Sequence, residues 1–211
     1  MRHAIVIAAV LLFAAGCADK PASVKKAASP LPEKAPEVYR VKFETTKGVF
    51  VAEVSKAWAP HGAEHFYTLA RSRYYDGVPF YRVVRNFVAQ FGISFDTAAA
   101  NLWSQLRIPD DPVKQKNRKG TLCFAAQGPA SRTTQLFINL KDNTILDKSG
   151  FAPIGRVVEG MEVVAQLYSS YGEMAPRGNG PDPKRIEREG KAYLERSFPR
   201  LDYIKRASIL P

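Results

Sequence analysis

Residues 80–92 read FYRVVRNFVAQFG, an aromatic and valine-rich segment that predicts a strand, a turn and a second strand. Two polar side chains, Arg82 and Gln90, stand inside it, although a buried strand has no use for them unless a partner needs their hydrogen bonds. Because side chains alternate between the faces of a strand, Phe80 and Arg82 should share one face. An arginine offers a rigid fork of donors and cannot act as a base. The segment therefore predicts a surface of hydrogen-bond donors among aromatic rings.

The sequence on both sides of this segment predicts more short strands and a few helices. They do not alternate as regular βαβ units, so we expect a mainly β protein, either a closed β-barrel or a sandwich, with helices capping it. The following elements are expected: strands in 39–54 (two, around a turn at 46–48), 120–126, 135–140, 151–158 and 201–210, helices in 60–75, 158–171 and from Pro183 with Asp182 as cap, and a long loop in 93–119.

Length and charge restrict the class of protein. A chain of 211 residues suits one domain with appendages. The formal net charge of +11 raises the question of nucleic-acid binding, but the basic residues are spread along the chain and mixed with acidic ones. Nucleic-acid modules instead cluster their basic residues on one face. We therefore expect a basic protein with no nucleic-acid partner.

The N-terminus predicts export. Residues 1–16 begin with Arg2 and His3 and continue as an apolar run too short to cross the hydrocarbon core of a bilayer, which is typical of a signal peptide. Small residues lead directly into Cys17, an arrangement that resembles the lipobox of bacterial lipoproteins, although Ala14 stands where leucine is commonest. The alternative is an ordinary signal peptide without lipid. The favoured interpretation makes Cys17 the site of lipidation.

The expected organisation follows from this anchor. Residues 17–37 are rich in Ala, Pro and Lys and predict a flexible tether, and residues 38–211 form the folded domain. The protein should lie in the bacterial cell envelope, held on a membrane by the lipid, on the periplasmic face if the cell is Gram-negative. We expect a monomer.

Two features that suggest other chemistry have simpler interpretations. Residues 61–65, His-Gly-Ala-Glu-His, match the inverted zinc-protease motif, but catalytic zinc needs three protein ligands and no third is evident. A solvated helix face carrying His61 and His65 is the favoured interpretation, and no metal is predicted. Cys123 lies in an apolar run and is interpreted as a small core residue.

Three segments, in this order, resemble the cyclophilin peptidyl-prolyl isomerases. FYRVVRNFVAQFG is similar to the family's Phe-His-Arg-Val/Ile…Phe…Gln-Gly-Gly segment. Residues 120–140 resemble its Gly-x-x-x-Met/Phe-Ala…Gly-Pro…Ser/Thr-Gln-Phe-Phe-Ile run, and residues 146–164 its stretch ending in Phe-Gly-x-Val-x-x-Gly-Met. The resemblance covers residues 40 to about 170. It implies a closed eight-stranded antiparallel β-barrel capped by helices, with the site on the outer surface and no cofactor.

The resemblance also assigns roles to individual residues. Arg82 takes the place of the catalytic arginine, and the substrate-binding positions fall on three groups of residues. These are Phe87, Val88, Phe137 and Leu146 in the proline pocket with Phe151 at its rim, Gln90 and Gln135 beside the Ala125 and Ala126 main chain along the substrate backbone, and Tyr81 where many members have histidine.

The resulting hypothesis is an isomerase that acts on Xaa-Pro bonds of exported proteins. The alternative is a low-turnover chaperone or scaffold module that binds proline on the same fold. Three substitutions relative to the family pattern support this alternative: Tyr81 replaces a histidine, Phe91 a glycine and Leu136 a phenylalanine. Separately, residues 172–200 form an insertion before the last strand, and we expect its helix to pack on the barrel.

Overall fold

The computed structural model describes residues 34–211, and eight strands in this part of the chain form one antiparallel sheet. Their order across the sheet is β3–β4–β6–β5–β7–β2–β1–β8. The strands are β1 (Val38–Thr45), β2 (Val49–Ser55), β3 (Arg82–Val84), β4 (Val88–Phe91), β5 (Thr121–Phe124), β6 (Leu136–Asn139), β7 (Pro153–Glu159) and β8 (Ile204–Ile209).

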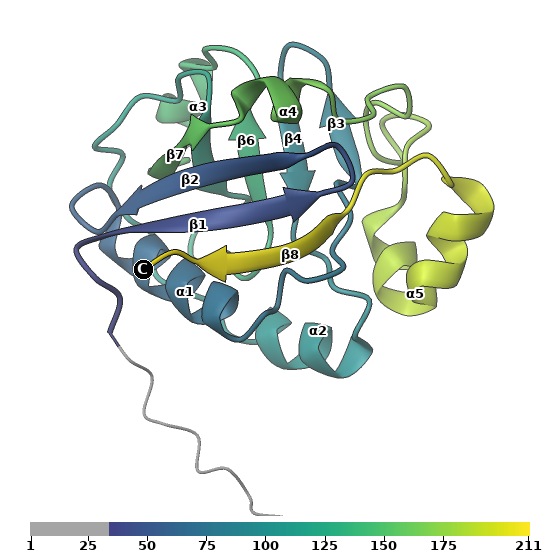
Figure 1. Ribbon diagram of the computed structural model, residues 1–211, viewed down its shortest axis with the longest axis horizontal. Coiled ribbons are helices and arrows are strands. Elements are labelled where there is room, and N and C mark those ends of the chain that lie inside the picture. The colour runs from purple at the N-terminus through teal and green to yellow at the C-terminus, as the bar shows by residue number, and fades with distance from the viewer. Residues whose placement is uncertain (1–33) are drawn as a thin grey trace, which may run out of the picture. The chain divides into compact units, whose positions relative to one another are not determined.

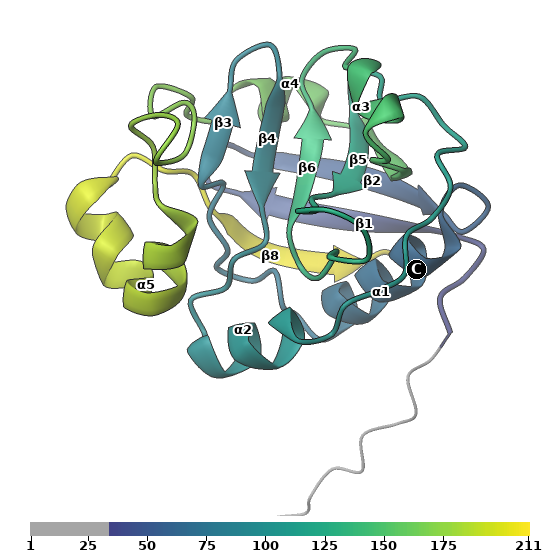
Figure 2. The same cartoon turned by 180° about the vertical axis from the view of Figure 1, so that it is seen from behind.

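Helices lie at the edges of this sheet. Figure 1 shows α1 running along β8, whereas α5 stands to the side, next to the start of β8. Figure 2 shows from behind that α5 is also on the β3 side of the sheet. The helices of the described residues are α1 (Pro60–Arg71), α2 (Thr97–Ser104), α3 (Ile145–Lys148), α4 (Met161–Ala165) and α5 (Pro183–Ser197).

The sheet curls into an open half-barrel around the core. The closed barrel predicted from the sequence is therefore not confirmed. β3 and β8 are the two ends of the row, and within residues 34–211 no strand ladder joins them. A single bridge pairs Pro79 with Tyr203, and the Phe80 amide donates to the Asp202 carbonyl at 2.9 Å. The mainly β architecture with eight antiparallel strands is as expected, but the chain leaves strand geometry just before β3, so the barrel stays open there.

Aromatic rings fill the concave side of the half-barrel. Phe43 and Phe50 face each other across β1 and β2 with ring centroids 4.6 Å apart, and Phe91 meets Phe43 edge-on at 5.9 Å. Helix α1 adds Phe66 and Leu69, both fully buried. Burying each such side chain contributes roughly 1.5–3 kcal/mol, so this shared core is what holds the sheet curled around α1.

Most predicted elements are present, but the long loop expected in residues 93–119 contains a helix. Helix α2 begins after Asp96, whose carboxylate accepts from the amides of Ala98 and Ala99 at 3.0 Å. An aspartate before an alanine run is a helix-start signal, and the prediction missed it. Helix α3 was not predicted either. Helix α1 ends at Arg71, four residues earlier than expected, and α4 covers only part of 158–171.

A distant carboxylate caps helix α1. Asp111 accepts from the amides of His61 and Gly62, both at 2.9 Å, and its side chain also pairs with Arg132 Nη2 at 2.9 Å. The Arg132 and Asp111 side chains are 5% and 0% exposed, so this ion pair is buried. Asp111 therefore fastens the loop after α2 to the start of α1.

The histidines of the zinc-like motif do not share a solvated face. His61 is exposed, whereas His65 is half-buried and one ring nitrogen lies 2.7 Å from the Thr133 carbonyl. The His65 ring packs against Trp103 and Phe124. Burial lowers the His65 pKa, which favours the neutral ring. The favoured interpretation was therefore wrong for His65, because Trp103 of helix α2 packs against its ring.

The insertion forms a small core of its own beside the barrel. Asp182 caps α5 by accepting from the Lys184 amide, and Pro183 occupies the first turn, as predicted. The helix buries Ile186, Tyr193 and Leu194, which pack together with Tyr81, Ile93 and Leu201. The predicted packing of this helix on the barrel is confirmed, and Tyr81 joins the two.

Two observations concern the part of the chain nearest the membrane anchor expected from the sequence. Ala35, in the range predicted as tether, is buried in the main core and its amide donates to Glu64 Oε1 at 2.8 Å. Cys17 lies outside the described residues. None of the helices in residues 34–211 is long and apolar enough to cross a membrane.

Candidate active site

Four neighbouring strands place four side chains in one row on the convex side of the sheet. The register pairs Arg82 of β3 with Gln90 of β4, Gln90 with Phe137 of β6, and Phe137 with Cys123 of β5. Successive residues of a strand face opposite sides, so this row faces away from the core. The neighbouring row belongs to the main core and consists of Val83, Ala89, Ile138 and Leu122.

The expected alternation fails before Arg82. Phe80 was predicted to share a face with Arg82, but it is fully buried in the main core, as is Val83. The strand begins only at Arg82, and the preceding residues pair with the chain that leads into β8. This change of partner rotates Phe80 inward.

Hydrogen bonds join the polar side chains of the site into a chain. Arg82 Nη1 donates to Gln90 Oε1 at 2.9 Å, and Gln90 Nε2 donates to Gln135 Oε1 at 3.3 Å. The Tyr81 hydroxyl donates to the same Gln135 oxygen at 2.6 Å. The side-chain oxygen of Gln135 thus accepts two hydrogen bonds within the protein, from Tyr81 and from Gln90.

A carboxylate from the insertion completes this chain at its other end. Arg82 Nε donates to Glu173 Oε1 at 2.6 Å and Arg82 Nη2 donates to Glu173 Oε2 at 2.7 Å. The Arg82 and Glu173 side chains are 14% and 29% exposed. The hydrogen bonds from Arg82 hold the Glu173 pKa below its usual range, so this residue is ionised at neutral pH. Sequence reasoning did not identify Glu173.

An apolar cluster lies beside the guanidinium group. The Arg82 Cζ atom is 5.5 Å from the centroid of the Phe87 ring, and Phe137 meets Phe151 edge-on at 5.5 Å. The structure brings together every apolar residue predicted for the proline pocket. The cluster consists of buried Val88, Cys123 and Phe137, with half-buried Phe87, Ala125, Leu146 and Phe151 packed against them.

Three buried asparagines hold the walls of this cluster. Asn143 Nδ2 donates to the Phe87 carbonyl at 2.8 Å and to Asn139 Oδ1 at 2.7 Å. Asn139 Nδ2 donates to Asn117 Oδ1 at 3.0 Å, and Asn117 Nδ2 donates to the Phe151 carbonyl at 2.8 Å. Sequence reasoning missed all three, although an asparagine inside the apolar run Leu-Phe-Ile-Asn is a signal of such a network.

Cys123 forms part of the floor of the cluster. Its thiol is fully buried and donates to Asn117 Oδ1 at 3.1 Å. Burial raises the pKa of the Cys123 thiol, so it stays protonated at neutral pH. The interpretation of Cys123 as a small buried residue is confirmed, and it does not provide a nucleophile.

Tyr81 lies behind the site and does not line the apolar cluster. Its ring is 1% exposed and packs against the insertion, and only its hydroxyl reaches the site through Gln135. Burial raises the pKa of the Tyr81 phenol far above its ordinary value, so the hydroxyl remains a donor. This hydrogen bond holds the side-chain oxygen of Gln135 toward Tyr81.

The remaining predicted positions fall at the margin of the site or inside the barrel. Ala125 and Ala126 follow β5 and are half-buried, and the Ala125 amide donates to the Gln135 carbonyl at 2.8 Å. Phe91 and Leu136, two of the departures from the family pattern, are fully buried in the main core. These two substitutions therefore change the interior packing and do not reshape the convex surface.

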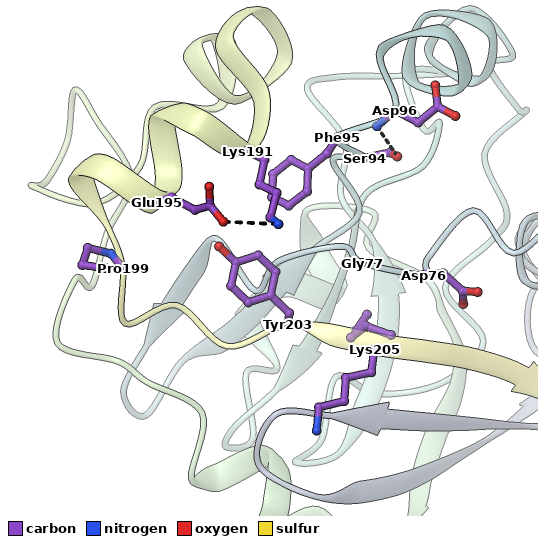
Figure 3. Close-up of a pocket in the computed structure, with 11 residues that line it drawn as sticks. Asp76, Gly77, Ser94, Phe95, Asp96, Lys191, Glu195, Pro199, Tyr203 and Lys205 are labelled. Carbon is purple, nitrogen blue, oxygen red and sulfur yellow. Dashed lines mark hydrogen bonds and ion pairs between the residues drawn. The ribbon is translucent and has the colours of Figure 1, made fainter.

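The described residues show no metal site at this surface, and a groove beside α5 lies apart from it. Within residues 34–211, no three His, Cys, Asp or Glu side chains are grouped to hold a metal ion. A groove of about 830 Å³ lies between α5, the segment after β4 and the start of β8 (Figure 3). Its lining includes Phe95, Tyr203 and the Lys191–Glu195 ion pair, and no residue of the predicted site.

Comparison with known proteins agrees with this arrangement. The sequence pattern of the family described as cyclophilin type peptidyl-prolyl cis-trans isomerase/CLD matches residues 40–187, more than half of the chain. A peptidyl-prolyl cis-trans isomerase of Acinetobacter baylyi is 33% identical over 133 residues, which cover 60% of this chain and 70% of the relative. Peptidyl-prolyl cis-trans isomerase B of Escherichia coli is 31% identical over 141 residues, covering 60% of this chain and 82% of the relative.

Solved structures show the same fold. A cyclophilin type peptidyl-prolyl cis-trans isomerase of Cryptosporidium parvum superposes with a TM-score of 0.60 at 19% identity, covering 82% of this chain and 98% of the other. A second structure of that protein, determined in the presence of the dipeptide Ala-Pro, also gives a TM-score of 0.60. The chain therefore belongs to the cyclophilin family and is a peptidyl-prolyl cis-trans isomerase.

Proposed function

We propose that Arg82 accelerates rotation about Xaa-Pro bonds by donating hydrogen bonds to the twisted amide. Amide resonance sets a barrier of about 18–20 kcal/mol, and resonance is lost at the twisted transition state. In the planar ground state the lone pair of the prolyl nitrogen is delocalised into the carbonyl group. In the twisted state it becomes localised on the nitrogen and can accept a hydrogen bond. A donor that binds this form more strongly than the planar form lowers the barrier, which is the requirement for catalysis.

The observation that carries this proposal is the position of the guanidinium group between the acceptors that hold it and an apolar surface. It lies over Phe87 at the edge of the apolar cluster, in line with Gln90 and Phe137 across the sheet. A guanidinium has five N–H groups, and contacts within the described residues use three of them. The others are free to reach a substrate beside the cluster.

The same surface supports a proline-containing peptide as substrate. The cluster around Phe137 offers apolar walls for a proline ring, which has no N–H to satisfy. The Gln135 amide can donate to a neighbouring peptide carbonyl, because its oxygen is already bound by Tyr81 and Gln90. The proposed arrangement holds the peptide on both sides of the bond while Arg82 acts on the bond itself.

Magnetisation-exchange NMR on a short Xaa-Pro peptide tests this proposal. Full-length protein at a small fraction of the peptide concentration should produce exchange between the cis and trans proline signals, whereas the unaided reaction takes tens to hundreds of seconds. Signals that shift and saturate with added protein, without exchange, would instead support the low-turnover binding module. A heat-unfolded sample of the same protein is the control.

We propose further that the enzyme acts as a monomer on exported proteins and is held on a membrane by lipid at Cys17. The lipobox-like sequence ending at Cys17 supports this proposal. We expect the full chain, expressed in a bacterial host, to incorporate labelled palmitate and to fractionate with membranes. The Cys17→Ala variant should lose both label and membrane association, and a labelled Cys17→Ala variant would contradict the proposal. Cys123→Ala, which removes the other cysteine, is the matched control.

A further inference from the structure

We infer that Glu173, supplied by the insertion, is a positioning residue for Arg82 in the isomerase reaction. This inference rests on the proposed role of Arg82 as the donor. Glu173 binds the Nε and Nη2 atoms of the guanidinium at 2.6 and 2.7 Å. It acts through Arg82 and is not itself proposed to touch the substrate.

The geometry of the pair determines which edge of the guanidinium faces outward. A carboxylate that binds Nε and Nη2 occupies the side edge of the planar group and fixes its rotation. Gln90 Oε1 holds Nη1 at 2.9 Å from another direction. An unrestrained arginine side chain would lose rotamer freedom on meeting a substrate. With Glu173 and Gln90 in place, much of that ordering is complete before the peptide binds.

The loop that carries Glu173 is built to hold it. The Glu173 carbonyl accepts from the Gly180 amide at 2.8 Å, and the Met174 amide donates to Glu173 Oε1 at 3.0 Å. A Cβ atom at Gly180 would stand 2.7 Å from the Glu173 carbonyl oxygen, so the close approach requires glycine there. A backbone bridge between Gly172 and Val83 ties the loop to β3, next to Arg82. Figure 2 shows the loop before α5 beside β3.

The insertion also supports the opposite end of the polar chain. Met174 and Tyr171 pack against the small core that contains Tyr81, Ile186 and Leu194. Tyr81 in turn holds the Gln135 carbonyl oxygen at 2.6 Å. The insertion therefore contacts Arg82, proposed to act on the rotating bond, and through Tyr81 it supports Gln135, proposed to bind a neighbouring peptide carbonyl. Through these contacts the residues of the insertion have a role in the reaction.

The test separates the catalysed step from binding in the full-length protein. Peptide Kd comes from chemical-shift titration, and kcat comes from the cis–trans exchange rate at saturation. Glu173→Ala should lower kcat about 10-fold and leave Kd within about 3-fold, because a loosened catalytic group costs rate more than affinity. Glu173→Gln, which keeps the shape and one acceptor, should fall between Ala and the parent.

Two controls isolate the contact. Glu189→Gln removes a carboxylate of the same insertion that binds Arg185 through two bonds of 2.8 and 2.9 Å, away from the site, and should leave kcat unchanged. The double variant Arg82→Ala/Glu173→Ala should be no slower than Arg82→Ala alone, because Glu173 has no other route to the substrate. The Arg82 Nε–H signal should lose its protection from solvent exchange in Glu173→Ala and keep it in Glu189→Gln.

The outcomes distinguish this inference from the proposal on which it rests. If Arg82→Ala retains the parent rate, the proposed donor role fails. If Arg82→Ala is impaired but both Glu173 variants keep the parent kcat, or exceed it, the positioning role is wrong. A higher rate would mean that the carboxylate restrains Arg82 by neutralising its charge. A rise in Kd with unchanged kcat would also overturn the inference.

Discussion

Arg82→Ala is expected to lower kcat/KM for an Xaa-Pro peptide by roughly 100- to 1,000-fold, the usual cost of removing one preorganised donor from an active site. The Arg82 side chain is 14% exposed and its guanidinium is held by Glu173 and Gln90, so its hydrogen bonds require no reorganisation when the amide twists. Most of the loss should appear in kcat, because the apolar cluster that holds the proline ring remains. Exchange NMR at saturating peptide measures this directly.

Two comparisons make the Arg82 prediction specific. Arg82→Lys keeps the positive charge but loses the planar fork, so it should recover only a small part of the rate. Thermal unfolding of Arg82→Ala should begin within a few degrees of the parent, because the side chain lies at the surface of the sheet. A folded Arg82→Ala protein with more than a third of the parent kcat/KM would contradict the proposed role of this residue.

Asp111→Ala is expected to reduce the free energy of unfolding by roughly 3–5 kcal/mol, as is typical when one partner of a buried ion pair is removed. The substitution leaves the buried Arg132 guanidinium without its closest carboxylate. It also removes the acceptor for the first two amides of α1, His61 and Gly62. Urea unfolding followed by far-UV circular dichroism measures the change.

The neighbouring Asp110 provides the matched control. Its side chain is 46% exposed and lies 3.5 Å from Arg132 Nε, so Asp110→Ala removes the same charge from a solvated position. We expect it to cost about 1 kcal/mol or less, as exposed ion pairs do. Equal losses in the two variants would show that burial of Asp111 is not the source of its contribution.

The insertion, residues 172–200, contributes to the active site as well as to the packing of the barrel. Its helix was expected only to pack on the barrel, and Ile186, Tyr193 and Leu194 do so. The loop before that helix also brings Glu173 to Arg82, across a sequence separation of 91 residues. An element that looks like an appendage in the sequence thus contributes an ion pair to the centre of the site.

The local pattern of the chain was enough to predict most of the strands. FYRVVRNFVAQFG predicted a strand, a turn and a second strand, and the structure pairs Arg82 with Gln90 across this hairpin. The resemblance of three motifs to the cyclophilin family identified the residues of the apolar cluster around Phe137, because such motifs are recognised within short stretches of sequence.

Only the tertiary structure decided the contacts that hold those residues in place. Glu173, Asp111 and Asn143 each act on a distant element, and their partners depend on where loops return to the sheet. The inward turn of Phe80 and the open edge between β3 and β8 likewise follow from a change of strand partner at Pro79. Such contacts leave no periodic signal, because one polar residue in a loop looks the same whether it meets water or a buried arginine.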